Sequence, residues 1–309
     1  MHRIIIDTDP GVDDSMAILL AFRSPELHVE GLTTVFGNTG TDITTANALR
    51  LVELAGKPET PVARGAEKPL LRPYIGEGWR VHGRNGLGGV DMPPAQGKPD
   101  PRRAAQFIVD MVMANPGEIT LVPLAPLSNI ALAVMLEPDI VKNVKQVVLM
   151  GGAATVPGNA SPAAEANIRN DPEAASIVFH AGWPLVMVGL DVTMKTQMSD
   201  SYLEELHRDG NPQTDFIYAI TRHYVGLYKS RGITSMPVHD PSAISYLIDP
   251  TLFKTSKAFV DIETHSPYNQ GQTMPDWRGQ REQEANVDVC VDVDSERLLK
   301  MYRQHLRGE

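Results

Sequence analysis

The chain has almost no cysteine, and this shortage excludes whole classes of site. Cys290 is the one cysteine among 309 residues, so an intrachain disulfide and a zinc site built from cysteines are both excluded. Cys290 lies in the alternating segment 287–293, which is typical of a strand. We therefore expect it to be a packed thiol.

Basic charge and long apolar runs are also scarce. The chain has 28 Lys and Arg residues against 38 Asp and Glu, a net charge of -10. Without a basic patch to neutralise phosphates, we expect no nucleic-acid partner. No apolar run approaches the ~18 residues of a membrane span, and residues 1–3 lead into a strand pattern without a signal-peptide hydrophobic region. We expect a cytoplasmic protein with no membrane partner and a small-molecule substrate.

Several sequence signatures of common enzymes are missing. We find no glycine-rich phosphate loop with its lysine, no dinucleotide fingerprint, no nucleophile-elbow serine and no zinc-binding helix motif. The chemistry must therefore be carried by other residues.

Apolar strand patterns alternate with helical patterns along most of the chain. Hydrophobic residues make up 42% and charged residues 21%, which suits a globular protein with a large core. The length would permit two domains, but we favour one over residues 1–309. The alternation predicts an α/β fold: a single doubly wound, mostly parallel sheet with flanking helices and a helical C-terminal region around the active-site rim. The expected strands are 3–7, 29–36, 61–63, 119–124, 145–150, 184–189, 257–263 and 286–293. The expected helices are 13–23, 42–56, 101–114, 126–137, 171–182 and 294–307, with 199–249 mostly helical.

Residues 64–100 interrupt this alternation. They are rich in glycine and proline and contain the glycine-rich run 81–89. A loop of this length in a compact domain usually has a function, so we expect a lid or a wall of the site.

The most informative segment is a cluster of acids between the first strand and the first helix. Four carboxylates fall within eight residues: Asp7, Asp9, Asp13 and Asp14. One such aspartate would cap a helix or fill a turn, but four at a buried strand end repel one another unless a cation or protons relieve them. An EF-hand loop does not fit, because Gly11 and Val12 occupy its fifth and sixth positions. A phosphatase-type strand end fits Asp7 and Asp9, although Gly11 stands where a hydroxyl residue is usual.

Polar residues also follow other predicted strands. Ligands of open parallel sheets bind beyond the carboxyl ends of the strands. Asn38 follows the second strand, and the segment after 150 supplies Asn159, Glu165 and Asn167. Singly, such residues are loop caps. Together, their amides and carboxylate suit the hydroxyl groups of a sugar.

The segment 238–242 forms a second constellation. His239 and Asp240 before a proline are consistent with a helix N-terminus; the functional reading is a general acid beside a metal ligand. His82 is a weaker candidate, since a loop histidine is often solvated. Tyr224 and Tyr228 share a helical face, where at least one is expected to pack in the core.

These motifs, in this order, resemble the nucleoside hydrolases of the inosine-uridine preferring type. The likeness covers residues 3 to 293 and is carried by four segments: 7–14, 148–152, 165–167 and 238–241. It implies calcium-dependent hydrolysis of the N-glycosidic bond of ribonucleosides to free base and ribose, and it implies a homodimer or homotetramer.

The resemblance also implies roles for individual residues. Asp9 would be the base that activates a water bound by the calcium ion, and His239 would protonate the departing base. The implied calcium ligands are the side chains of Asp9, Asp14 and Asp240 and the main-chain carbonyl of Leu124. The implied substrate-binding residues are Asp13, Asn38, His82, Met150, Asn159, Glu165, Asn167, Tyr228 and Asp240.

The chain departs from the family pattern in two places and leaves one question open. Leu124 and Ala125 stand where threonine and glycine are frequent, and Ala166 stands where a bulkier residue often borders the sugar. The region 229–237 matches no specificity pattern, so the preferred base stays open.

The same residues permit two alternatives to a nucleoside hydrolase. An aspartate-nucleophile phosphotransferase would use Asp7 and magnesium, but Gly11 and the lack of a catalytic lysine context disfavour it. A nucleoside- or ribose-binding protein without catalysis is disfavoured by the presence of Asp9 and His239.

Overall fold

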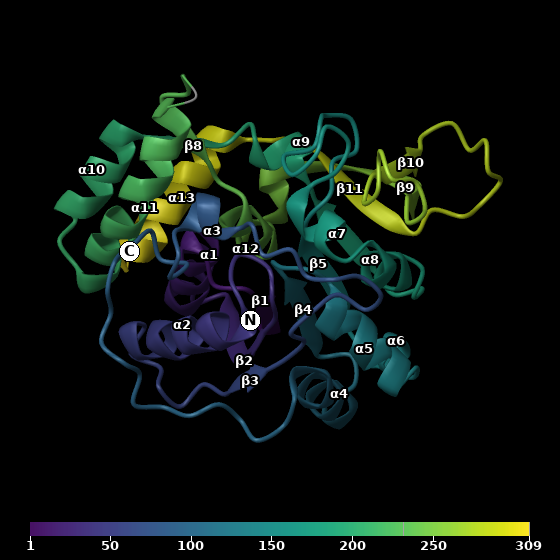
Figure 1. Cartoon of the computed structure of the whole chain (residues 1–309), viewed down its shortest axis with the longest axis horizontal. Helices are drawn as coiled ribbons and strands as arrows, with labels where there is room; N and C mark the ends of the chain where they lie inside the picture. Colours follow the sequence, from purple (N-terminus) through teal and green to yellow (C-terminus); the bar gives the residue numbers. More distant parts are fainter. Residues whose placement is uncertain (231, 309) are drawn as a thin grey trace.

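The computed structural model describes residues 1–230 and 232–308 and has a central sheet between two layers of helices (Figure 1). Within these residues nine strands form one sheet in the order β10-β9-β11-β6-β5-β4-β1-β2-β3. The strands are β1 (His2–Thr8), β2 (Leu27–Thr34), β3 (Val62–Arg64), β4 (Ile119–Pro123), β5 (Gln146–Met150), β6 (Leu185–Val188), β9 (Phe253–Ile262), β10 (Thr273–Asp276) and β11 (Val287–Val293). All neighbouring pairs are parallel except β9 with β11 and β10 with β9. The predicted mostly parallel α/β fold is confirmed.

The order of the strands reverses between β1 and β4. The chain moves outward from β1 to β2 and β3, then returns to place β4 on the other side of β1. Asp7 lies in register with Thr33 of β2 and Pro123 of β4. The carboxyl ends of these strands therefore meet at one rim, at the topological switch point where ligands of such sheets bind.

Helices cover both faces of the sheet. On one face lie α1 (Val12–Arg23), α2 (Thr41–Leu54), α10 (Asp200–Arg208), α11 (Pro212–Ser230), α12 (Asp240–Ile248) and α13 (Ser295–Arg307). On the other lie α4 (Ala104–Ala114), α5 (Ser128–Leu136), α6 (Ile140–Asn143) and α8 (Pro172–Phe179). The remaining short elements are α3 (Trp79–His82), α7 (Ala166–Asn170), α9 (Leu190–Thr193), the 3-10 turn η1 (Pro250–Leu252) and the paired strands β7 (Gln197–Ser199) and β8 (Ser235–Pro237).

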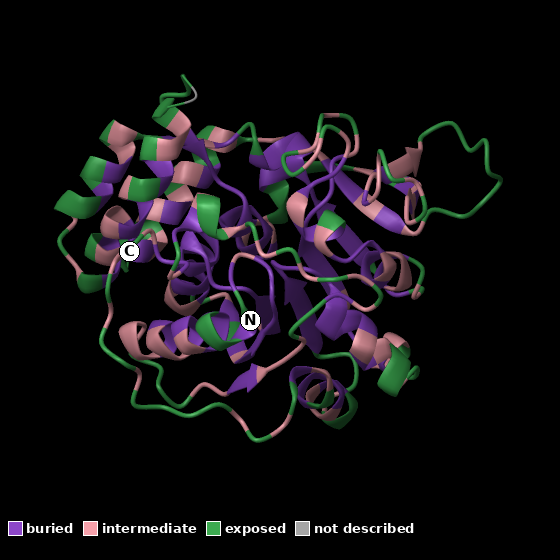
Figure 2. Cartoon of the chain, viewed as in Figure 1, coloured by how far each residue is buried: buried purple, intermediate pink, exposed green. Residues whose placement is uncertain are grey.

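The isoleucines of β1 explain why this strand has a continuous apolar sequence. Ile4 and Ile6 pack with the α1 layer, whereas Ile5 packs with the α4 layer. Alternate side chains of a strand point to opposite faces, so a strand covered on both sides must be apolar at every position. Figure 2 shows the buried sheet between helices whose outer faces are exposed.

The structure differs from the predicted elements mainly in short pieces. The 199–249 region contains β8 as well as helices, and its residue Arg231 lies outside the described part. The helix α3 interrupts the long 64–100 segment, and α7 and α9 were not expected. Helices of one turn carry little periodic signal and form only through tertiary contacts. None of the described helices is long and apolar enough to cross a membrane.

Candidate active site

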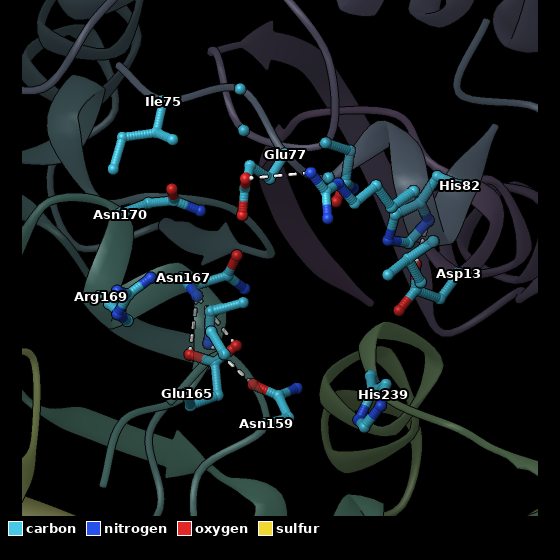
Figure 3. A pocket seen from close by; sticks show the side chains of 18 of the residues that line it. Asp13, Ile75, Glu77, His82, Asn159, Glu165, Asn167, Arg169, Asn170 and His239 are labelled. Atoms are coloured by element: carbon cyan, nitrogen blue, oxygen red, sulfur yellow. Dashed lines mark hydrogen bonds and ion pairs between the residues drawn. The ribbon is translucent and has the colours of Figure 1, made fainter. Parts of the chain in front are cut away.

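A cavity of about 770 Å³ opens at the carboxyl ends of the central strands (Figure 3). The β1–α1 turn, the end of β2, α11 and the β8–α12 junction contribute side chains to it. Residues of the 69–82 segment also line it, so the long loop forms a wall of the pocket. The second half of the pocket comes from β5 and the 159–170 segment.

The β1–α1 turn is held by Asp14. Its carboxylate accepts hydrogen bonds from the Thr8 hydroxyl at 2.5 Å, from the Gly11 backbone N–H at 3.0 Å and from the Asn38 amide at 3.0 Å. The Asp9 backbone N–H donates to it as well, at 3.2 Å. Four donors therefore fix the Asp14 carboxylate at the start of α1.

Asp9 lies against the end of β2. Its Oδ2 accepts the Asn38 backbone N–H at 2.6 Å, while its Oδ1 is buried without a hydrogen-bond donor among the described residues. The backbone of Gly37 passes so close to Asp9 that a Cβ on Gly37 would lie 1.9 Å from Asp9 Oδ2. Only glycine fits there, which explains the Gly-Asn pair after the second strand.

His82 reaches the site from α3. Its Nδ1 accepts the Val12 backbone N–H at 3.2 Å, and burial lowers its pKa to about 4. The ring is therefore neutral near pH 7 and carries its proton on Nε2. Asp13 Oδ1 lies 3.6 Å from the same Nδ1, but two acceptors cannot form an ion pair. Asp13 Oδ1 thus stays without a donor in the described residues.

The β8–α12 junction brings in the distant pair His239 and Asp240. Both are buried, with Asp240 in the first turn of α12. His239 Nδ1 lies 2.9 Å from the Thr193 hydroxyl oxygen. Burial lowers the pKa of His239, and the charge of Asp13 acts in the opposite direction.

The carboxylates at this end of the pocket form one electrostatic unit. Oxygens of Asp13, Asp14 and Asp240 lie within 4.8 Å of one another and could hold a metal ion. Burial raises the pKa of each, and repulsion between the carboxylates raises that of Asp14 and Asp240 further. The pKa of Asp9 is also raised, by burial and then by Asp14. Such a cluster holds its charge at neutral pH only with a compensating cation.

The opposite wall is built around Glu165. This residue caps α7, and its carboxylate accepts backbone N–H groups of Gly152 at 3.0 Å, Asn167 at 2.9 Å and Ile168 at 3.2 Å. Burial nevertheless raises its pKa to about 7. Figure 3 shows Glu165 and Asn159 across the pocket from Asp13.

Asn167 joins this wall to the neighbouring strand ends. Its amide donates to the Leu124 carbonyl at 3.0 Å and to the Met150 carbonyl at 3.1 Å. The Leu124 carbonyl, a predicted metal ligand, therefore accepts the amide of a predicted sugar-binding residue. The Leu-Ala sequence at 124–125 preserves this carbonyl, because backbone geometry and not the side chain provides it.

An aromatic group lies on the α11 side. The Tyr224 and Tyr228 rings meet edge to face at 5.1 Å between centroids, and the Tyr224 ring lies 5.6 Å from that of His82. Tyr224 is buried and Tyr228 is half-buried. Both line the pocket, so packing and contact with a ligand are compatible roles.

The structure brings most of the predicted site residues into one cavity. Asp13, Asn38, His82, Leu124, Met150, Asn159, Glu165, Asn167, Tyr228, His239 and Asp240 all line it. Asp9 and Asp14 are not among the lining residues, but both accept hydrogen bonds from Asn38, which is. The three carboxylates that lie close enough to share a metal ion include Asp13, for which the family resemblance implies a role in sugar binding, and do not include Asp9.

Several residues near the site lie outside the set that the sequence predicts. Tyr74, whose hydroxyl donates to the Gly37 carbonyl at 2.8 Å, lines the cavity, as do Glu77 and Arg80. Thr193 lies behind His239. The only available signal was their position in the long loop or just after a strand.

The fold and this pocket define an α/β protein with a carboxylate-rich site at its switch point, and comparison with known proteins gives its family. Residues 4–300 match the family model described as inosine-uridine preferring nucleoside hydrolase. An inosine-uridine preferring nucleoside hydrolase of Leishmania major is 42% identical, covering 96% of this chain and 95% of the relative. Uridine nucleosidase 1 of Arabidopsis thaliana is 40% identical, covering 99% and 93%.

Solved structures give the same result. A plant nucleoside hydrolase has a TM-score of 0.94 at 36% identity, covering 100% of this chain and 99% of that structure. A purine-preferring ribonucleoside hydrolase from Gardnerella vaginalis has a TM-score of 0.94 at 32% identity, with 99% and 98% covered. The chain belongs to the inosine-uridine preferring nucleoside hydrolase family. It is an N-glycosyl hydrolase whose substrates are small-molecule nucleosides.

Proposed function

We propose that the protein is a calcium-dependent ribonucleoside hydrolase in which Asp9 activates the attacking water and His239 protonates the leaving base. The observation that carries this proposal is the buried group of Asp13, Asp14 and Asp240, whose oxygens lie within 4.8 Å. These residues come from two elements far apart in the sequence and meet in the pocket. Burying three neighbouring carboxylates is costly unless a cation compensates their charge.

The donor set fits a hard divalent cation. Asp9 and Asp13 each keep a buried oxygen without a donor in the described chain, and every candidate ligand is a carboxylate or carbonyl oxygen, as calcium prefers. Asp9, Asp14, Asp240 and the Leu124 carbonyl would hold the ion. When bound, the ion would supply positive charge that keeps these carboxylates ionised and binds hydroxyl groups of the sugar and water.

The reaction replaces a carbon–nitrogen bond by a carbon–oxygen bond. Water adds to the anomeric carbon as the bond to the base breaks, and the electron pair of that bond leaves with the base. Asp9 accepts a proton from the water, and His239 delivers one to the base nitrogen. Positive charge grows on the ribose ring in the transition state, and the surrounding carboxylates stabilise it.

The opposite wall would bind and orient the ribose. Asn159, Glu165 and Asn167 offer amide and carboxylate groups, and Met150 lines the same cavity. Asp13, Asn38 and Asp240 would meet the sugar from the other side, and His82 and Tyr228 would border the base. Because the ribose 2′-hydroxyl would contact the ion, 2′-deoxyribonucleosides should be poor substrates.

The test is a reducing-sugar assay over purine and pyrimidine ribonucleosides. We expect ribose release from the untreated protein, loss of release after exhaustive chelation and recovery with Ca²⁺. Recovery with Mg²⁺ alone would contradict calcium as the ion, and no release from any ribonucleoside would contradict the function. The homodimer or homotetramer and the single domain stay predictions; light scattering after size-exclusion chromatography tests the first.

A further inference from the structure

Thr193 is the polar side chain that contacts the inner nitrogen of His239. Its hydroxyl oxygen lies 2.9 Å from Nδ1, and Thr193 is fully buried while His239 is 5% exposed. A threonine and a histidine separated by 46 residues are thus brought together in the interior. A buried imidazole nitrogen needs a partner, and this hydroxyl is the partner that the described residues provide.

The helix that carries Thr193 is hydrogen-bonded at its first residue to the segment that follows β5. α9 begins where β6 ends, and the Leu190 backbone N–H donates to the Gly152 carbonyl at 2.9 Å. The N–H of the same Gly152 donates to Glu165. A Cβ on Gly189 would lie 2.8 Å from the Gly152 carbonyl oxygen, so the close approach depends on glycine.

A second contact of α9 holds the segment that leads to Asn159 and Glu165. Asp191 accepts the Ala154 N–H at 2.8 Å, the Thr155 N–H at 2.8 Å and the Thr155 hydroxyl at 2.6 Å. One short helix therefore contacts both the proposed catalytic histidine and the segment that leads to the sugar-facing residues.

We infer that Thr193 is a positioning residue for the reaction, which accepts a hydrogen bond from His239 Nδ1–H and so leaves Nε2 as the nitrogen that gives its proton to the leaving base. This inference rests on the proposed role of His239. The protonated ring donates Nδ1–H to the Thr193 oxygen. When the bond to the base breaks, the Nε2 proton moves to the base nitrogen, and the neutral ring keeps Nδ1–H on Thr193. The role is similar to that of any group that orients a general acid or base from behind.

The chain offers a conservative variant and a matched control. Thr193→Ser keeps the hydroxyl, whereas Thr193→Val keeps the shape and removes it. Thr196 is also buried, and its hydroxyl contacts Ser295 at 3.1 Å instead of His239. Thr196→Val therefore makes the same change in the same segment without touching the imidazole.

The experiment compares two leaving groups. On inosine, Thr193→Val should lower kcat by about 10- to 100-fold, a part of the about 10²- to 10⁴-fold that general acid catalysis supplies, with KM changed less than about threefold. On an activated nitrophenyl riboside, which needs little protonation, the same variant should keep kcat within about threefold. Thr193→Ser should keep at least about a third of the kcat of the original protein on both substrates, and Thr196→Val should match the original protein.

A double variant tests whether Thr193 acts through His239. If it does, Thr193→Val should cost nothing more in a protein that already carries His239→Ala, because residues acting as a unit are not additive. Equal losses on both substrates, or a full additional loss in the double variant, would overturn the inference. If His239→Ala shows the leaving-group dependence and Thr193→Val shows none, the inference fails while the proposed function stands. If His239→Ala shows no such dependence, the acid role itself fails.

Discussion

The two walls of the pocket differ in whether their carboxylate oxygens all have hydrogen-bond donors. On the β1–α1 side, Asp9 and Asp13 each keep a buried oxygen without a donor in the described residues. On the facing side, Glu165 receives three backbone N–H groups. Burying a charge is costly unless it is paired or hydrogen-bonded. We therefore expect a cation to complete the β1–α1 side, whereas backbone N–H groups already stabilise the Glu165 carboxylate on the facing side.

The largest expected effect comes from removing Asp9 on the β1–α1 side of the pocket. Asp9→Ala should lower kcat by more than about 10³-fold, because it removes the proposed base and a metal ligand at once. Steady-state assays on inosine and uridine check this, with circular dichroism to verify folding. Asp42→Ala is a suitable control, since Asp42 is an exposed acid of α2 paired with Arg64. An Asp9→Ala variant with a tenth of normal activity would rule out this role.

Calcium affinity should separate the two walls directly. Asp240→Asn should weaken Ca²⁺ binding to the metal-depleted protein by about 10- to 100-fold or more, since even supporting residues of metal sites have effects of this size. Glu165→Gln should leave the affinity within about threefold. Isothermal titration calorimetry measures both. Comparable losses in the two variants would show that the walls are not distinct in this respect.

Glu165 should make the free energy of unfolding depend on pH. Its folded-state pKa of about 7 lies above the ordinary 4.5, so the folded protein binds the proton more tightly. The stabilisation of the folded state by this proton is fully present below about pH 4.5 and is lost as the pH rises through about 7. Over this range the free energy of unfolding should fall by up to about 3 kcal/mol. Urea unfolding at fixed calcium should show this fall, and Glu165→Gln should reduce its slope. An unchanged slope would contradict a raised pKa at Glu165.

The smallest effect is expected at Asn159, an exposed residue on the same side of the pocket as Glu165. Asn159 is exposed and accepts one hydrogen bond, from the Ala166 N–H at 3.0 Å. Asn159→Ala should raise KM by about 2- to 10-fold, because one ordinary hydrogen bond to the substrate contributes a free energy of this size. The fall in kcat should be smaller than the rise in KM. A loss confined to kcat would show that Asn159 acts in the transition state instead.

Much of the fold was predictable because its signals are local. The apolar runs around Ile4–Ile6 and Val147–Leu149 marked strands covered on both faces, and both are in the central sheet. The short elements α3, α7 and α9 were missed, since single turns have no periodic pattern and depend on contacts made elsewhere. The first half of the site was predictable for the same reason as the strands: its acids lie within eight residues.

The sequence by itself determined the strand–helix alternation, the acid cluster at the first turn and, through four motifs, the family. Only the tertiary structure decided which polar atoms meet. It brought Asp240 within reach of Asp13 and Asp14 and placed Thr193 behind His239. It also gave Glu165 its donors and left Asp9 and Asp13 without them. Hydrogen bonds and charge repulsion act over a few ångströms of space, and that distance is set by packing, not by separation along the chain.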